Sequence, residues 1–322
     1  MRALVFDREL RLEEDSPRPE PGLGEALIRV KLVGICNTDL ELTRGYMQFH
    51  GVPGHEFVGE VERAPGAEEW LGRRVVGDIN AACGNCPACQ AGRHTHCPHR
   101  TTLGIAGRGG AFAEYLTLPV GNLHPVPESL PDEVAVFTEP LAAACEILQQ
   151  IHIRPTDRVI VLGDGKLGLL CAQVLALTGC DLMVVGHYRE KLNLLTRRGI
   201  PTALEETFTE AGVDVVVEAT GRGEGYQAAR RLVRPRGTIV LKSTYHGPID
   251  VDLTMAVVDE ITLVGSRCGP FAPALRLLEQ GLVEVSSLIQ ARYPLSAVLN
   301  AFDQAAIKGT LKILVEIPDT PS

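Results

Sequence analysis

The sequence has 322 residues and a formal net charge of −9, from 31 basic and 40 acidic side chains. At roughly 150 residues per domain, this length predicts about two domains, each able to bury its own core. A hydrophobic fraction of 45% and a charged fraction of 22% exclude wholesale disorder and a fibrous repeat. The acidic balance argues against a nucleic acid or an anionic membrane as partner, because either would need a basic face.

No segment has the roughly 20 consecutive apolar residues that would cross a bilayer. Asp7 and Glu9 stand where a signal peptide would keep an apolar stretch. We therefore expect a cytoplasmic protein with no membrane partner. In that reducing compartment the nine cysteines are expected to be thiols or metal ligands rather than disulfides.

The predicted elements change in character near residue 140. Before it, short β-type runs alternate with Gly- and Pro-rich turns, which predicts a compact β unit; the runs lie at 3–6, 25–35, 56–62 and 73–79. A helix over 141–151 follows Glu139 and Pro140. Between 158 and 266, strand and helix patterns alternate, which indicates an α/β fold with a doubly wound parallel sheet. A helix over 274–281 and a strand over 311–317 follow.

A glycine motif stands between the first strand and the first helix of the alternating region. It has the form G-x-G-x-x-G, and its residues are Gly163, Gly165, Lys166, Leu167 and Gly168, with one further residue between the first two glycines. In this context the motif predicts a pyrophosphate site, since the glycines allow a tight turn, close backbone approach and close helix packing. The alternative is a glycine-rich turn without a ligand.

The end of the next predicted strand bears on the choice between the two nicotinamide cofactors. An NAD site usually has an acidic residue there, bonded to the ribose 2′-hydroxyl. This chain has Gly186, followed by His187 and Arg189. With no carboxylate and two potential cations, the sequence favours NADP over NAD. The alternative is that His187 and Arg189 are solvated and that NAD binds without an acidic partner.

Four cysteines are closely spaced as C-x2-C-x2-C-x7-C, at Cys83, Cys86, Cys89 and Cys97. Four thiolates in a loop rich in turn residues match a closed tetrahedral zinc site, which is structural because no position is open to substrate. The competing use of four cysteines is an iron–sulfur cluster.

A second set of possible ligands is dispersed along the chain. Cys36, Thr38 and Asp39 lie close together, His55 and Glu56 are adjacent, and Glu139 begins a predicted helix. One thiolate, one imidazole and one or two carboxylates would suffice for a zinc site with an exchangeable position. Each residue also has an ordinary structural interpretation, and spacing alone does not join them.

Taken in order, the segments GICNTD, GHEFVGE, the four-cysteine loop, TEPLAAACE, GDGKLG and VEATG resemble the zinc-dependent medium-chain dehydrogenase/reductase family. The resemblance covers nearly the whole chain. It implies a GroES-like catalytic domain made of residues 1–140 and 269–322, with a structural zinc lobe at 83–97. It also implies a Rossmann nucleotide-binding domain over 141–268.

The resemblance further implies roles for individual residues. Cys36, His55 and Glu139 would ligate the catalytic zinc, and Glu56 would be a displaceable fourth ligand or an outer carboxylate. Asp39 would accept a hydrogen bond from His55, and Thr38 would bind the substrate oxygen and begin a proton relay. The position where many relatives end that relay in His holds Glu41 here. Further residues match positions that line the cofactor: Thr220, Gly221, Ser243, Thr244, Ser266, Arg267 and Lys312.

The function implied is a zinc-dependent oxidoreductase that moves a hydride between an alcohol or polyol, or the matching carbonyl, and NAD(P). Two zinc ions per chain and a homo-oligomer, either dimer or tetramer, are expected. Two alternatives stand beside it. One is a non-catalytic NADP-binding protein of the same fold, and the other is a zinc-free quinone or enone reductase, whose relatives lack both metal motifs.

Overall fold

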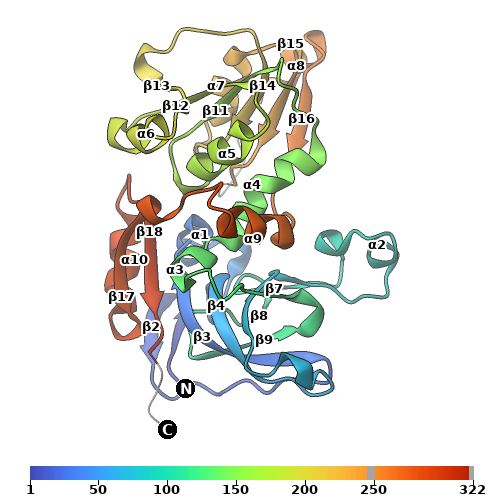
Figure 1. Ribbon diagram of the computed structural model, residues 1–322, viewed down its shortest axis with the longest axis vertical. Helices are drawn as coiled ribbons and strands as arrows, with labels where there is room; N and C mark the ends of the chain where they lie inside the picture. Colours follow the sequence, from blue (N-terminus) through green and yellow to red (C-terminus); the bar gives the residue numbers. More distant parts are fainter. Residues whose placement is uncertain (245–250, 319–322) are drawn as a thin grey trace. The chain divides into compact units, whose positions relative to one another are not determined.

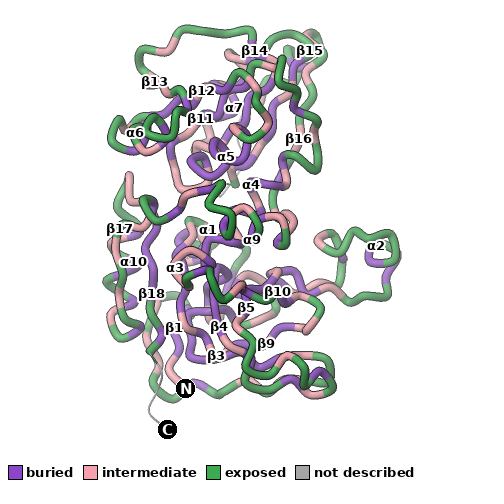
Figure 2. The backbone as a smooth tube through the Cα atoms, viewed as in Figure 1, coloured by how far each residue is buried: buried purple, intermediate pink, exposed green. Residues whose placement is uncertain are grey.

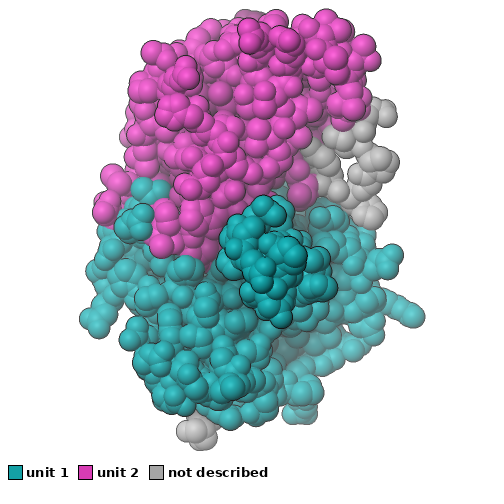
Figure 3. Space-filling view, turned by 90° about the vertical axis from the view of Figure 1, so that its right-hand side faces the viewer, with its two compact units in different colours: residues 1–139, 274–279, 288–322 teal, residues 140–273, 280–287 magenta. Residues whose placement is uncertain are grey.

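The computed structural model describes residues 1–244 and 251–318, which form two compact units. Unit 1 consists of residues 1–139, 274–279 and 288–322, and unit 2 of residues 140–273 and 280–287 (Figure 3). No helix among the described residues has the length and apolar character needed to span a membrane.

Unit 1 is built around a seven-stranded sheet in which the order is β10-β5-β4-β3-β18-β17, with β9 also paired to β3. Figure 1 labels β3, β4, β9, β17 and β18 of this sheet. The strands are β3 (Glu25–Gly34), β4 (Glu56–Arg63), β5 (Arg74–Gly77), β9 (Tyr115–Pro119), β10 (Leu123–Pro125), β17 (Ile289–Pro294) and β18 (Lys312–Glu316). β18 pairs antiparallel with β3, so the end of the chain completes the sheet begun near its start.

Smaller elements complete unit 1. One hairpin is formed by β1 (Ala3–Asp7) and β2 (Glu9–Glu13), and a three-stranded sheet by β6 (Asn80–Ala81), β7 (Thr101–Leu103) and β8 (Gly107–Arg108). The helices are α1 (Asn37–Thr43), α2 (Pro87–Gln90), α3 (Asp132–Ala135) and α10 (Val298–Ala306). α4 (Thr138–Gln150) has its first two residues in unit 1, and α9 (Phe271–Glu279) has its last six there.

Unit 2 contains a six-stranded sheet in which every pairing is parallel, in the order β13-β12-β11-β14-β15-β16. This is the 3-2-1-4-5-6 order of the doubly wound dinucleotide-binding fold. The strands are β11 (Arg158–Leu162), β12 (Asp181–Gly186), β13 (Thr202–Leu204), β14 (Val213–Glu218), β15 (Val233–Leu241) and β16 (Thr262–Gly265). Their connecting helices are α5 (Lys166–Ala176), α6 (Arg189–Thr196), α7 (Gly225–Leu232) and α8 (Leu253–Val258).

Burial explains the residue choice in the unit 2 sheet. The central strands β11 and β14 consist mostly of buried Val, Ile and Leu residues, and they are mostly purple in Figure 2. Parallel strands covered by helices on both sides need such runs. The edge strand β16 is mostly exposed. The α/β class inferred from the sequence is confirmed.

Candidate metal and nucleotide sites

The first candidate metal site is assembled by strand pairing. β3 and β4 are antiparallel with Gly34 opposite Glu56. Cys36, just after β3, therefore meets His55, just before β4. Possible ligand atoms of Cys36, His55 and Glu56 all lie within 4.8 Å of one another. The structure thus brings together three residues that the sequence left separated.

Asp39 connects this cluster to helix α1. Its Oδ2 accepts the backbone N–H of Cys36 at 2.8 Å, which caps the start of the helix. Its Oδ1 accepts the N–H of Gly54 at 3.2 Å and lies 3.2 Å from His55 Nδ1, although the ring is not aligned for a hydrogen bond. Burial lowers the pKa of His55, but the carboxylate of Asp39 outweighs it and holds that pKa well above its usual value.

Glu56 is 1% exposed and forms an ion pair with Lys312, which is also 1% exposed. Glu56 Oε2 accepts a hydrogen bond from Lys312 Nζ, while Oε1 is buried without a hydrogen-bond partner. The register of β18 explains the pair, since Leu314 lies opposite Gly34 and Lys312 is two residues before it. A Cβ at position 34 would lie 2.4 Å from Glu56 Oε2, so the pair needs a glycine there.

The surroundings of Lys312 differ from what the family resemblance implies, which is a position that lines the cofactor. In the structure its ammonium contacts Glu56, lies 3.4 Å from the carbonyl oxygen of Ile35, and stands 5.7 Å from the ring centroid of Phe137. A side chain enclosed in this way presents no ammonium surface to a nucleotide. Burial lowers the pKa of Lys312, but the Glu56 carboxylate raises it above its usual value.

Glu139 lies in the first turn of α4, where Pro140 is tolerated because the first helical N–H groups have no intrahelical partner. Its carboxyl does not belong to the group of ligand atoms, from Cys36, His55 and Glu56, that lie within 4.8 Å of one another. Burial raises the pKa of Glu139 to about 7; His55 and Lys312 lower it, and Glu56 raises it further. These interactions place the Glu139 carboxyl in the electrostatic field of the cluster.

The donor set fits a zinc ion. A thiol, an imidazole and a carboxylate are the usual zinc donors, and a carboxylate oxygen that is buried without a partner is costly unless a cation satisfies it. Glu56 Oε1 is such an atom. The residues present are therefore suited to hold the catalytic metal that the family resemblance implies.

The two residues considered for a proton relay lie in different surroundings. Thr38 Oγ1 is 3.7 Å from Cys36 Sγ, at the edge of the ligand cluster. The Glu41 carboxylate instead forms an ion pair at 2.7 Å with the guanidinium of Arg44, which is 59% exposed. Thr38 is therefore placed to meet a ligand of the metal site, whereas Glu41 is engaged at the surface.

The second candidate metal site is the four-cysteine lobe. The Sγ–Sγ distances are 3.5 Å for Cys86–Cys89 and for Cys83–Cys97, 3.8 Å for Cys86–Cys97 and 4.0 Å for Cys83–Cys89. Four sulfur atoms at roughly 2.3 Å from a tetrahedral zinc ion would be about 3.8 Å apart. The observed spacing excludes disulfides and leaves room for one ion at the centre of the four sulfurs.

The glycine motif of unit 2 has the geometry that the sequence predicts. Gly163 has φ +120°, and a Cβ there would lie 2.5 Å from the carbonyl oxygen of Ala219. A Cβ on Gly168 would lie 2.1 Å from the carbonyl oxygen of Gly163, whereas Gly165 has open space around its Cα. Lys166 and Leu167 begin α5, so the N-terminus of that helix faces the loop.

The other predicted cofactor residues follow the carboxyl ends of neighbouring strands, where ligands of doubly wound sheets bind. The N–H of Gly221 donates to Ser243 Oγ at 2.8 Å, which joins the loops after β14 and β15. Thr244 lies just beyond Ser243 and is exposed. After β16, Ser266 Oγ and the carbonyl oxygen of Arg267 both accept hydrogen bonds at 3.1 Å from Lys242 Nζ.

Two residues that organise these loops were missed by the sequence analysis. Glu218 Oε1, which is fully buried, accepts hydrogen bonds from Thr220 N at 2.8 Å, Thr220 Oγ1 at 2.6 Å and Ser243 Oγ at 2.9 Å. Lys242 holds the segment after β16. The alternation of strand and helix patterns predicts where each strand ends. It does not indicate which side chain near that end hydrogen-bonds to the neighbouring loops.

Gly186, His187 and Arg189 lie at the end of β12 and the start of α6. Gly186 is buried, and the other two are exposed. His187 Nε2 is 3.1 Å from a carboxylate oxygen of Glu205, whereas Arg189 makes no ion pair with a described residue.

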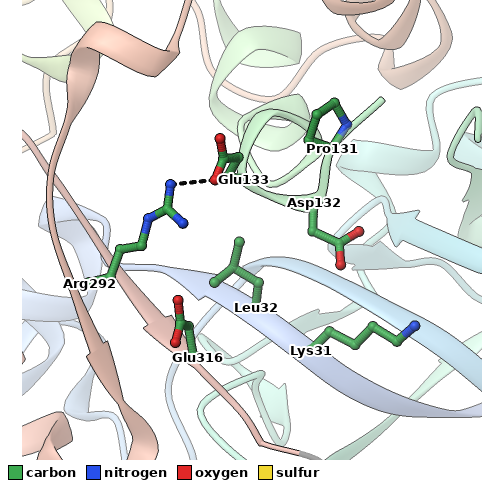
Figure 4. A pocket seen from close by; sticks show the side chains of 7 residues that line it. All are labelled: Lys31, Leu32, Pro131, Asp132, Glu133, Arg292 and Glu316. Carbon is green, nitrogen blue, oxygen red and sulfur yellow. Dashed lines mark hydrogen bonds and ion pairs between the residues drawn. The ribbon is translucent and has the colours of Figure 1, made fainter. Parts of the chain in front are cut away.

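One pocket of unit 1, of about 230 Å³, contains none of the predicted site residues (Figure 4). Charged side chains of both signs line it, and Arg292 pairs with Glu133 across it. We assign this pocket no functional role.

Two known families match separate parts of the chain. Residues 22–128 match the family described as the alcohol dehydrogenase GroES-like domain. Residues 167–280 match the family described as zinc-binding dehydrogenase.

Individual relatives agree with these matches. The chain is 30% identical to a sorbitol dehydrogenase from Halalkalibacterium halodurans over 324 residues, covering 94% of each chain. A putative zinc-binding dehydrogenase from Sinorhizobium meliloti bound to NADP is 28% identical, with a TM-score of 0.88, over 98% of this chain and 99% of the other. An alcohol dehydrogenase from Escherichia coli CFT073 in complex with NADH is 25% identical, with a TM-score of 0.89 and the same coverage.

Proposed function

The chain belongs to the zinc-type medium-chain dehydrogenase/reductase family, and from that premise we propose that it oxidises an alcohol or polyol, or reduces the matching carbonyl. Hydride passes between the substrate and NAD(P). Two zinc ions per chain are proposed, one held by Cys36, His55, Glu139 and, in exchange with substrate, Glu56. The other is held by Cys83, Cys86, Cys89 and Cys97.

The convergence of Cys36, His55 and Glu56 carries this proposal. Their ligand atoms lie within 4.8 Å of one another although they come from two different strand ends, and Glu56 Oε1 is buried with no partner. A zinc-free reductase would have no need of such a set. The sorbitol dehydrogenase among the relatives supports a polyol as substrate.

When bound, the zinc ion supplies a Lewis acid that lowers the pKa of a substrate hydroxyl or polarises a carbonyl. The chain's own residues supply position and proton transfer. Asp39 fixes the start of α1 and lies against the imidazole of His55, so it orients two ligands at once. Thr38 Oγ1 is proposed to accept the substrate hydroxyl proton and pass it onward.

The dinucleotide is proposed to lie along the carboxyl ends of the unit 2 strands. The pyrophosphate would take the N–H groups at Gly165, Lys166 and Leu167. The nicotinamide half would meet the loops that carry Thr220, Gly221, Ser243, Thr244, Ser266 and Arg267. The hydrogen bonds that Glu218 accepts and those that Lys242 donates hold these loops in place before the cofactor binds.

Replacement of Cys36 by Ala tests the metal assignment. We expect zinc per chain to fall by one and hydride transfer to be lost, while dinucleotide binding and the circular dichroism spectrum are kept. Cys180→Ala is the matched control, since Cys180 belongs to neither cysteine cluster. If Cys36→Ala kept near-normal turnover, the site would lie elsewhere. If the wild type bound dinucleotide but oxidised no member of a broad alcohol and polyol panel, the non-catalytic alternative would stand.

We also propose that the protein is a homo-oligomer of the cytoplasm. What supports the association is the edge strand β16, whose outer side has no partner strand among the described residues. Nearby in sequence, Leu253, Val257 and Val258 of α8 are 58%, 76% and 66% exposed. An unpaired edge with apolar neighbours is prone to pair with another chain. Light scattering of the purified protein should give the mass of a dimer or tetramer, and a monomer would refute this proposal.

A further inference from the structure

The structure explains why position 186 is a glycine rather than the usual acidic residue. Asp164, the residue between the first two glycines of the loop, places its carboxylate at the end of β12. Its Oδ2 accepts the N–H of His187 at 2.7 Å and that of Tyr188 at 2.5 Å. A Cβ at position 186 would lie 2.6 Å from Asp164 Cβ, 2.7 Å from its Oδ2 and 2.8 Å from its Cγ. Glycine at 186 is thus required by Asp164 and is not by itself a sign of a 2′-phosphate site.

The position of this carboxylate has a meaning for the cofactor. In NAD-binding folds of this kind, an acidic residue at the end of the second strand bonds the ribose 2′-hydroxyl, and its charge repels a 2′-phosphate. Here a carboxylate reaches the same strand end from the glycine loop. Asp164 is 6% exposed, and its Oδ1 accepts no hydrogen bond from the described residues, so one oxygen is left for a hydroxyl. We propose that Asp164 takes the place of the acidic residue at the end of the second strand and that it selects NAD over NADP. This inference rests on the proposed dinucleotide function.

The cations near this strand end are mostly engaged. His187 Nε2 and Arg222 Nη2 lie 3.1 Å and 3.0 Å from the same oxygen of Glu205. Lys191 is 6% exposed, and its ammonium stands 4.2 Å from the ring centroid of Tyr188. Burial lowers the pKa of Lys191, and the charges of Asp164 and Glu190 oppose that change.

Arg189 is the cation that could still argue for NADP. It is exposed and makes no hydrogen bond or ion pair with the described residues. If it held a 2′-phosphate, its removal would weaken NADPH binding and leave NADH binding unchanged. Asp164 and Arg189 therefore make opposite predictions that binding measurements can separate without any turnover.

The experiment measures dissociation constants of NADH and NADPH for the zinc-loaded full chain, by calorimetry at fixed ionic strength. The variants are Asp164→Asn, which keeps an oxygen to accept both N–H groups, and Arg189→Ala. Glu190→Gln is the matched control, because it removes an exposed carboxylate one residue beyond Arg189. Circular dichroism confirms that each variant is folded.

We expect the wild type to bind NADH at least tenfold more tightly than NADPH. Asp164→Asn should shift that ratio about tenfold toward NADPH, as loss of one charge a few ångströms from a phosphate would, and Glu190→Gln should not. If the wild type bound NADPH more tightly than NADH, and Arg189→Ala lost that preference, the inference would be overturned without any Asp164 variant. An unmoved ratio in a folded Asp164→Asn would also overturn it and leave the proposed function intact. If the wild type bound neither dinucleotide, the proposed function would fall, and this inference with it.

Discussion

Among single residues, Glu56 and Lys312 form an ion pair whose loss should have a large effect on stability. Both side chains are enclosed, and a charge left alone in such a place is far more costly than a charge with its partner. Lys312→Met should therefore lower the free energy of unfolding of unit 1 by about 3 kcal/mol. The single tryptophan, Trp70, lies in unit 1, so its fluorescence during urea titration reports this change.

Arg292→Met is the matched control for that measurement. Arg292 also pairs with a glutamate of unit 1, Glu133, but the two side chains are 47% and 36% exposed. Exposed pairs contribute less than about 1 kcal/mol. Equal losses in the two variants would show that Lys312 is not the counter-charge of a buried carboxylate.

The glycines of the dinucleotide loop give a second prediction, because they differ in what a methyl group would meet. Gly165→Ala puts its methyl in open space, where the pyrophosphate is proposed to lie, so NADH binding should weaken at least tenfold while thermal stability stays unchanged. Gly168→Ala puts its methyl 2.1 Å from the carbonyl oxygen of Gly163, so both quantities should fall. Calorimetry and thermal unfolding measure them.

Gly109→Ala serves as the control for the glycine variants. Nothing lies within 4 Å of a Cβ at Gly109, which belongs to unit 1. It should alter neither binding nor stability. Unchanged NADH binding in a folded Gly165→Ala would remove the pyrophosphate from this loop.

At the scale of elements, the four-cysteine lobe depends on its metal more than on a core. Within the lobe, the buried residues that form a cluster are three of the cysteines themselves, Cys86, Cys89 and Cys97. A segment with so little apolar surface to bury needs an ion to hold it. Cys89→Ser should lower zinc per chain by one and expose the 83–97 segment to limited proteolysis.

The lobe prediction has an internal comparison in Cys36→Ala, which should also lose one zinc ion but leave the 83–97 segment protected. Digestion followed by mass spectrometry locates the cuts. Should Cys89→Ser keep its full zinc content and resist the protease, the lobe would be held together by something other than the four thiolates.

How much the sequence predicts also depends on the element. The glycine loop, the cysteine spacing and the alternating strands are local patterns, and the structure has them where the sequence places them. β17 and α10 were not predicted, although β17 alternates between half-buried and exposed residues. The pairing of Lys312 with Glu56 was not predicted, since the two residues are 256 positions apart and only the pairing of β18 with β3 brings them together. Asp164 was passed over because its effect on Gly186 depends on a close approach between two loops.

For the molecule as a whole, the two proposed metal sites, both in unit 1, would serve different purposes. The lobe offers four thiolates and is closed. The Cys36 cluster offers one thiolate, one imidazole and the carboxylate of Glu56, which already accepts a hydrogen bond from Lys312. A closed site stabilises a fold, and a site with an exchangeable position can take a substrate oxygen. The proposed function therefore requires that both sites bind zinc in the same molecule.

Elemental analysis of zinc per chain in freshly purified protein is the decisive test. We expect a value near two, because the lobe and the Cys36 cluster each have donors for one ion. A value near one that added zinc does not raise would leave only the cysteine lobe occupied, and would contradict the assignment of a catalytic zinc to Cys36, His55 and Glu139.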